Sequence, residues 1–288
     1  MDHPSFPDFS PRIYGVDPIL VAPATWDDLL GRCAAMGFDH VLLLGHQRIV
    51  ELGGDDADQS GAVRLAEISK LCQRHSLQLL VEFTPTRLAP DEPVLRDHPA
   101  WFSSPSGMPE ATESDPLPDP RFAHTPCAAD ELLACLPRFD APDAAEGLLP
   151  WWGARLMPLL ELGVGGFLCR EPGSMPAPQW QRLMEITHRQ RPNCRFLAWT
   201  PGCRHDQLDQ LVGSGFDAVF SSGAWWDFRA PWFFREYHKL AAIAPVLAFP
   251  EDPSGPRLAR AQGFHDLQTR RTGALRALRF ATLSGAGW

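Results

Sequence analysis

Two hydrophobic stretches of the sequence each end in residues that could bind or act on a ligand. The stretch GVGGFLCREPG, at 163–173, puts Arg170 and Glu171 directly after a run of small and apolar residues, and CRFLAWTPG, at 194–202, ends its apolar run in Trp199. A carboxylate can act as general acid, general base or nucleophile, a guanidinium can bind an anion, and an indole offers an apolar face. A single structural arrangement should explain why both apolar runs end in such residues.

Further candidate residues follow other apolar runs of the chain. They are Glu82 and Arg87 at and after the run at 77–83, Trp225 and Trp226 after the run at 217–220, and Glu251 and Asp252 after the run at 245–249. Each has a simpler alternative. A surface carboxylate often has no role, a tryptophan pair often serves core packing, and Arg170 and Glu171 could form a solvated ion pair with each other.

The charge balance limits the classes of partner. The formal net charge is −9 and no Lys/Arg-rich run occurs, so the chain lacks the basic face that nucleic-acid binding requires. No apolar run approaches the length of a membrane span, and the first residues resemble no secretory signal. These observations predict a cytoplasmic protein that binds neither nucleic acid nor membranes.

Cysteine and histidine spacing gives no sign of a metal site. The seven cysteines contain no CxxC pair and the ten histidines are scattered. Five of the cysteines lie beside apolar residues, which predicts reduced, mostly buried thiols; they are Cys33, Cys72, Cys135, Cys169 and Cys194. No metal and no other cofactor is expected.

A repeating order of strand, loop and amphipathic helix must position the candidate residues. The predicted strands are 12–16, 39–44, 77–83, 165–169, 195–199, 217–220 and 245–249. The predicted helices are 24–38, 60–76, 129–136, 151–163, 178–190, 205–215, 230–244 and 272–284. In the first helix, Thr25 is the expected N-cap and Gly37 the expected stop.

This order predicts a parallel sheet in an α/β protein. Continuous apolar runs indicate strands buried on both faces, and the strands carry no GxGxxG or P-loop motif. A TIM-type (β/α) barrel is therefore preferred over an open doubly wound sheet. We expect one domain over 1–288, with a proline-rich excursion at about 103–128. In a barrel, residues just past the strands share one mouth, which brings Arg170, Glu171 and Trp199 together.

Several segments of the chain resemble the α-amylase superfamily, and in particular its maltose-1-phosphate maltosyltransferase branch, and the resemblance covers nearly the whole chain from Pro11 onward. The resemblance lies in RLAPDEPVLRDHPAWF (87–102), GVGGFLCREPG, RFLAWTPG, FPEDPSGPRLA (249–259) and ALRALRFATLSGAGW (274–288), in that order. It implies a (β/α)8 barrel that acts on α-glucans by a retaining mechanism, usually as a homodimer. The chain stops at SGAGW, where the family would continue into its eighth strand, so a barrel truncated before that strand is expected.

The resemblance also identifies which positions would carry the chemistry. A retaining mechanism needs a carboxylate nucleophile and a carboxylic acid about 5 Å apart. In the family, the fourth strand ends in the pattern F-R-V-D-N-P, whose Asp is the nucleophile. The matching residues of this chain read FLCREP, so Arg170 occupies the nucleophile position and Leu168 the position of the family's arginine two residues earlier. The pattern F-L-A-E ends the fifth strand, and Trp199 stands at the acid. Glu82 occupies a position at which amylases carry Asp, and Arg87 one at which they carry His. Glu251 and Asp252 follow the seventh strand, where amylases have a His-Asp pair that binds the sugar.

Three hypotheses follow from these departures. The preferred one is a catalytically degenerate barrel that binds an α-glucan or maltooligosaccharide, or acts as scaffold or regulator for a partner or fused maltosyltransferase. The substrate-binding candidates are then Glu82, Arg87, Arg170, Trp199, Trp225, Trp226 and Asp252. The second hypothesis is an active transferase or hydrolase that uses Glu171, Glu251 or Asp252. The third is a protein-interaction domain without a sugar site.

Overall fold

The computed structural model describes residues 9–45, 57–86, 88, 92–103, 136–253, 258 and 266–287. All but the first residue of the proline-rich excursion predicted at 103–128 lies outside these ranges, as do Arg87, Cys127 and Cys135. No helix in the described part of the chain is both long and apolar enough to cross a membrane.

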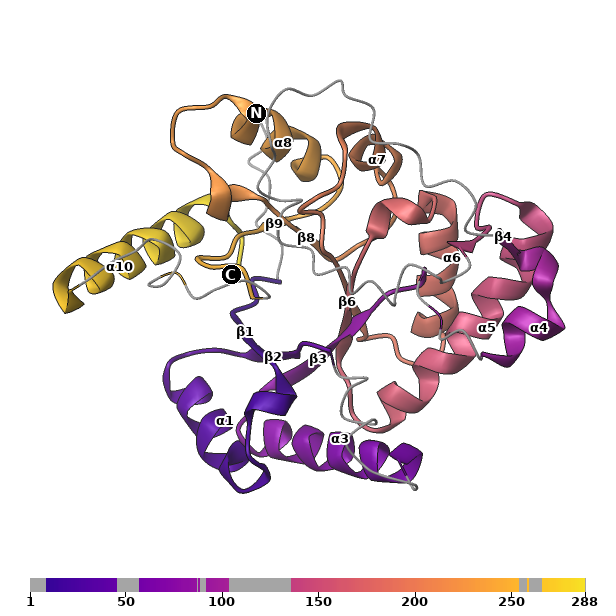
Figure 1. Ribbon diagram of the computed structural model, residues 1–288, viewed down its shortest axis with the longest axis horizontal. Helices are drawn as coiled ribbons and strands as arrows, with labels where there is room; N and C mark the ends of the chain where they lie inside the picture. Colours follow the sequence, from indigo (N-terminus) through magenta and orange to yellow (C-terminus); the bar gives the residue numbers. More distant parts are fainter. Residues whose placement is uncertain are drawn as a thin grey trace.

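Seven parallel strands form one curled sheet at the centre of the molecule (Figure 1). In their order along the sheet they are β1 (Ile13–Val16), β2 (His40–Leu43), β3 (Gln78–Phe83), β6 (Gly166–Cys169), β7 (Arg195–Ala198), β8 (Ala218–Phe220) and β9 (Val246–Leu247). Each strand pairs in parallel with the next. The seven predicted strands and the truncated TIM-type barrel are thus confirmed.

Helices surround this sheet on its outer side (Figure 1). The α-helices are α1 (Trp26–Ala35), α3 (Ala57–Arg74), α4 (Pro93–Asp97), α5 (Pro142–Glu161), α6 (Ala177–His188), α7 (His205–Gln210), α8 (Trp232–Ala241) and α10 (Leu267–Ser284). The described 3-10 turns are η1 (Pro18–Leu20), η2 (Pro23–Thr25), η4 (Pro99–Trp101), η6 (Pro172–Ser174) and η7 (Gly223–Trp225). A small antiparallel pair of strands, β4 (Phe102–Ser103) and β5 (Leu136–Pro137), was not predicted.

The start of α5 differs from the prediction. A helix was expected only from residue 151, where the helical pattern WWGARLMPLLELG begins. A proline inside a helix removes a hydrogen bond and costs about 3 kcal/mol. The structure runs the helix from Pro142 through Pro150 and Pro158. Its first half buries Ala144, Ala145, Leu148 and Leu149, and this apolar contact offsets the cost of the internal prolines.

Three smaller predictions about helix ends also need comparison with the structure. Thr25 is the N-cap residue of α1, but its hydroxyl donates to the Ala22 carbonyl and does not cap the helix. Gly37 does end that helix, with a φ of 89° that favours glycine. Of the helix predicted at 129–136, only Leu136 is described, and it lies in β5.

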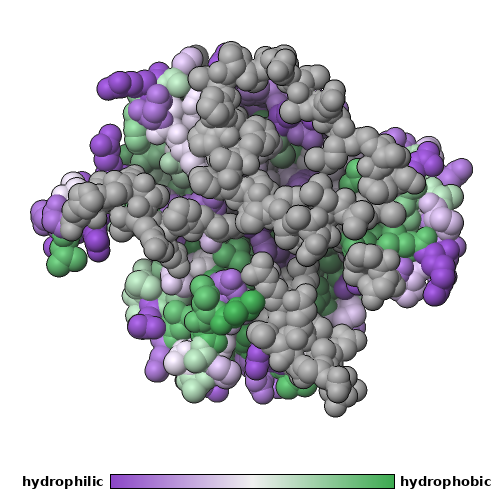
Figure 2. All heavy atoms as spheres, in the orientation of Figure 1, coloured by the Kyte–Doolittle hydropathy of each residue, from purple (hydrophilic) through white to green (hydrophobic). Residues whose placement is uncertain are grey.

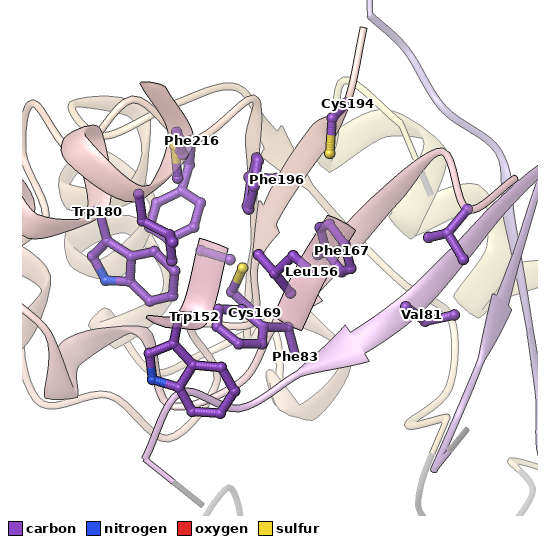
Figure 3. Close-up of a cluster of buried hydrophobic side chains, with 14 of the residues drawn as sticks. Val81, Phe83, Trp152, Leu156, Phe167, Cys169, Trp180, Cys194, Phe196 and Phe216 are labelled. Atoms are coloured by element: carbon purple, nitrogen blue, oxygen red, sulfur yellow. The ribbon is translucent and has the colours of Figure 1, made fainter. Parts of the chain in front are cut away.

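Alternate residues of the strands enter two separate apolar layers. The outer layer lies between sheet and helices and includes Val81, Phe83, Phe167, Cys169 and Phe196, with Trp152 and Trp180 from α5 and α6 (Figure 3). The inner layer fills the barrel with Leu42, Leu80, Leu168, Leu197, Ala218, Phe220, Leu247 and Phe249. This two-residue period, which strand geometry requires, fixes the side of the sheet on which each strand-end residue lies.

The two edge strands of the sheet come together through the residues after α10. Gly287 forms a parallel bridge with Leu247 of β9, and the Ala286 amide donates to the Val246 carbonyl at 2.7 Å. The Ser10 hydroxyl donates to the Ala286 carbonyl, and a Cβ at Gly287 would collide with the backbone of Pro11. Residues 286–287 therefore join β9 to the segment that leads into β1.

Candidate functional site

Arg170 and Trp199 both continue the inward-facing series of their strands. Arg170 follows Leu168 by two positions and Trp199 follows Leu197 by two, and both leucines belong to the inner layer. The sheet pairing extends to these residues, since the Arg170 amide donates to the Phe83 carbonyl at 2.8 Å and the Trp199 amide donates to Cys169 at 2.9 Å. The strands thus direct the two side chains into the carboxyl-terminal mouth of the barrel.

Arg170 forms an ion pair with Glu82 of the neighbouring strand β3. Arg170 Nε donates to Glu82 Oε1 at 2.6 Å, and Nη2 contacts the same oxygen. The side chains are only 20% and 15% exposed, so the pair is shielded from most of the solvent. The Gly45 amide donates to the other carboxylate oxygen at 2.5 Å. Both oxygens of Glu82 are therefore engaged by groups of the chain itself.

The other face of Arg170 meets an aromatic stack. The guanidinium carbon lies 4.6 Å from the centroid of the Trp199 ring, which is a cation–π contact. Trp199 in turn stacks on Phe249, with centroids 5.0 Å apart and planes 23° apart, and Trp225 meets Phe249 edge-on at 5.3 Å. We call Glu82, Arg170, Trp199, Phe249 and Trp225 the mouth cluster. These side chains contact one another in sequence across the mouth.

At Glu171 the backbone no longer continues the direction of strand β6. Its φ is 51°, in the left-handed region that few non-glycine residues adopt, and it precedes η6 as the N-cap residue. Its carboxylate accepts a hydrogen bond from the buried hydroxyl of Thr86 at 2.6 Å, although the residue as a whole is exposed. The backbone turn at Glu171 therefore sets the direction of this carboxylate.

The remaining candidates lie in different surroundings. Glu251 is half-buried, and its Oε2 accepts a hydrogen bond from the Leu258 amide at 2.8 Å. Asp252 is half-buried as well, and Arg87 lies outside the described residues. Trp226, unlike its neighbour Trp225, stacks on Phe233 of α8 with centroids 4.5 Å apart, and its Nε1 donates to the Ala230 carbonyl. Trp226 therefore packs against the helix side, and its contact with a ligand stays a prediction.

The thiols near the mouth are buried, and burial keeps them in their protonated, unreactive form. Cys169 directly precedes Arg170 but points into the outer layer, where burial raises the pKa of its thiol well above the ordinary value. Burial likewise raises the pKa of Cys194 to about 12. These thiols, with Cys33 and Cys72, are free and buried as predicted. In the described part of the chain, no three His, Cys, Asp or Glu residues cluster as metal ligands would.

Two contributors to the mouth cluster were not predicted from the sequence. Phe249 lies at the end of the strand expected at 245–249, two positions after Leu247, so the two-residue period could have indicated that it faces inward. Gly45 contributes only a backbone amide from the loop after β2. No side chain marks such a donor in a sequence.

Comparison with known proteins gives the following relatives. No protein-family model matches the chain. The α-1,4-glucan:maltose-1-phosphate maltosyltransferase of Burkholderia pseudomallei is 35% identical over an alignment of 301 residues, which covers 98% of this chain and 25% of that protein. The protein of the same name from Cereibacter sphaeroides is 27% identical over 190 residues, which cover 62% of this chain and 25% of that protein. The chain thus spans about a quarter of the curated relatives it matches.

Superposition on solved structures shows which proteins share the fold of this chain. An α-amylase from Lactobacillus plantarum superposes with a TM-score of 0.58 at 13% identity, covering 89% of this chain and 66% of the amylase. An Anoxybacillus α-amylase superposes with a TM-score of 0.60 at 12% identity, covering 92% of this chain and 67% of the amylase. At such low identity these matches establish the barrel architecture only.

Proposed function

We propose that this chain, which is related to the α-1,4-glucan:maltose-1-phosphate maltosyltransferases and has the barrel architecture of α-amylases, is a catalytically inactive barrel that binds an α-glucan or maltooligosaccharide. In this role it would act as a binding or scaffolding domain for a partner or fused maltosyltransferase in the cytoplasm. The whole chain from 1 to 288 would form this one domain.

The mouth cluster carries the proposal. The retaining mechanism that the resemblance implies passes through an oxocarbenium-like transition state, which develops positive charge at the anomeric carbon. The cation of Arg170 would repel that charge, and the indole of Trp199 has no proton that it can transfer to a leaving group. Loss of a nucleophile alone typically costs on the order of 10⁴- to 10⁶-fold in rate. Within the mouth cluster, the carboxylate of Glu82 pairs with the cation of Arg170.

An active enzyme is the second candidate, since carboxylates remain near the strand ends. Glu171 is the strongest of them because it is exposed and follows the nucleophile position directly. Against this role, its backbone turns away from the strand and its carboxylate is bonded to Thr86. Glu251 is bonded to the amide of Leu258. These bonds favour structural roles for both carboxylates.

Glucan binding is supported by the aromatic part of the cluster. Trp199 and Trp225 are half-buried, so each residue keeps some exposed surface. Sugar C–H faces pack on indole rings, and Phe249 holds both indoles in place through direct ring contacts. The position of the rings above the inner apolar layer matches the mouth at which barrels of this class bind ligands.

Two measurements test the proposal. The purified chain, incubated with maltose 1-phosphate and glycogen, should release no inorganic phosphate; measurable release that disappears in Glu171→Gln would establish the active-enzyme alternative instead. Calorimetric titration with maltoheptaose should show binding that Trp199→Ala removes. Trp151→Ala, which alters a half-buried tryptophan on α5, is the matched control and should bind normally. Absence of binding by the unmodified chain would favour a protein-interaction domain.

A further inference from the structure

Helix α8 carries a carboxylate on its buried face. The buried residues of this helix are Phe233, Glu236 and Leu240, which recur at three- and four-residue spacing and therefore share one face. Figure 2 shows hydrophilic residues, in purple, spread around the rim of the molecule, whereas Glu236 is only 3% exposed. No other acidic residue in the described part of the chain is buried to this extent. Burial of a carboxylate costs free energy unless hydrogen bonds compensate, so these bonds need to be identified.

The carboxylate of Glu236 binds one residue just after strand β8. Its Oε1 accepts a hydrogen bond from the Ser222 hydroxyl at 2.6 Å, and its Oε2 accepts one from the Ser222 amide at 3.2 Å. Ser222 is itself buried, and it is the N-cap residue of the 3-10 turn η7. Both hydrogen-bond donors of Ser222 are thus directed at the same carboxylate.

Ser222 in turn sets the path of η7. Its carbonyl accepts a hydrogen bond from the Trp225 amide at 3.0 Å, and the Gly223 carbonyl accepts one from the Trp226 amide at 3.0 Å. Packing holds the turn as well, since a Cβ at Gly223 would lie only 3.1 Å from the ring of Phe233. The turn is therefore anchored twice on helix α8, by a hydrogen-bonded carboxylate and by an aromatic ring.

The path of η7 directs two adjacent tryptophans to different places. Trp225 meets Phe249 edge-on at 5.3 Å and belongs to the mouth cluster, whereas Trp226 stacks on Phe233 at 4.5 Å. The direction of each ring follows the backbone of the turn. A binding site built on such a segment depends on the surrounding hydrogen bonds and packing that hold the segment in place.

We propose that Glu236 is a positioning residue, which holds the ring of Trp225 at the mouth through Ser222 and does not touch the ligand. This inference rests on the proposed function, in which an α-glucan packs on that ring. It accounts for a carboxylate at a buried helix position where a leucine would anchor α8 at a lower desolvation cost. An anchor for the helix alone would need no hydrogen-bonding group directed at the turn that carries Trp225.

Calorimetric titration with maltoheptaose provides the first test. Glu236→Leu removes both acceptors but suits a buried position, and it should weaken binding by about three- to tenfold, the loss expected when one aromatic contact is misplaced. Glu236→Gln should bind within about twofold of the unmodified chain, because its side chain can accept from the Ser222 amide and donate to the Ser222 hydroxyl. Unchanged affinity in Glu236→Leu, or the same loss in both variants, would overturn the proposal.

Two further variants separate positioning from a general effect on the fold. In a Trp225→Ala background, which keeps Trp199, Glu236→Leu should change the affinity by less than about twofold, since the ring through which it acts is gone. Glu185→Leu removes an exposed carboxylate from α6 and is the matched control for the change in charge, so it should bind normally. The same loss in the Trp225→Ala background as in the unmodified chain, or a comparable loss in the control, would contradict a role through Trp225.

A measurement without ligand keeps this inference distinct from the proposed function. With isotope-labelled tryptophan, nuclear magnetic resonance should show the indole N–H signal of Trp225, identified by Trp225→Phe, shifted or broadened in Glu236→Leu. The signal of Trp180, which is fully buried on α6, should stay in place. If Glu236→Leu does not fold, Ser222→Ala removes one of the two bonds and should move the Trp225 signal by less.

The two kinds of measurement fail separately. An unmoved Trp225 signal in the folded variants overturns the positioning role of Glu236. A moved signal, combined with no binding of maltoheptaose by the unmodified chain, supports the positioning of the ring and overturns the proposed glucan-binding function.

Discussion

The two faces of strands β6 and β7 have opposite chemistry although their residues alternate along the same four-residue segments. The outer face presents Phe167, Cys169 and Phe196 to the helices and is a dry apolar core (Figure 3). The inner face begins with leucines and ends in Arg170 and Trp199, which bond to side chains across the barrel. The fold depends on the outer face. Changes at the end of the inner face should therefore leave the barrel intact, provided that the new residues satisfy one another.

The largest loss of stability should follow removal of an aromatic ring from the outer layer. Trp180 is fully buried, contacts Phe83 and Phe216, and donates its Nε1 hydrogen to the Pro172 carbonyl. Trp180→Ala should lower the free energy of unfolding by about 3–5 kcal/mol in urea titration. The half-buried Trp151→Ala should cost much less. Trp151 packs on the same layer as Trp180, so equal losses would mean that full burial does not determine the size of the effect.

Breaking the ion pair at the mouth should have an intermediate effect. Glu82→Gln and Arg170→Met each leave a partly exposed partner without its opposite charge, and each should lower stability by about 1–2 kcal/mol, since solvent screens part of the interaction. The double variant should cost less than the sum of the two, which a double-mutant cycle in urea measures. Strict additivity would show that the two side chains are not coupled.

The contact between Arg170 and Trp199 should contribute less. Trp199→Phe keeps an aromatic ring against Phe249 but weakens the attraction of the ring face for the guanidinium. We expect a loss of about 0.5–1 kcal/mol, measured by the same titration. In the Arg170→Met background the substitution should cost less than in the unmodified chain. If the cost is the same in both backgrounds, stacking on Phe249 and not the cation accounts for it.

The smallest effect is expected at the opposite end of the barrel, where Asp39 bonds His40 and Arg12. Burial raises the pKa of Asp39, but the hydrogen bonds from His40 and from the Arg12 amide outweigh it and lower this pKa below 3.8. The carboxylate therefore stabilises the fold above its unfolded pKa of about 4, and this contribution is lost as the pH falls through the folded-state value. Asp39→Asn should be less stable by about 0.5 kcal/mol at pH 6.

Urea titrations at several pH values check this prediction. The difference between the unmodified chain and Asp39→Asn should shrink from pH 6 towards about pH 3. A difference that is constant over this range would mean that the asparagine acts through altered packing and not through the missing charge.

The strands and their inward-facing residues were predictable because a two-residue period is a local property of the chain. Arg170 and Trp199 lie at the mouth of the barrel because each follows an inward leucine by two positions. The pairing of Arg170 with Glu82 was not predictable, since residues 88 positions apart meet only once the strand register is fixed. The start of α5 was placed too late because the residues before 151 become helical through burial against the surrounding structure, which local sequence patterns do not show.

The joint between residues 286–287 and the segment before β1 has a consequence for biosynthesis. Ser10 and Ala286 are separated by 276 positions, so their contact cannot form until nearly the whole described chain has left the ribosome. Contacts between such distant positions carry the highest loop-closure entropy and form late. During translation the sheet would therefore grow strand by strand with both borders unjoined, and the nascent protein would be most vulnerable to aggregation just before this last closure.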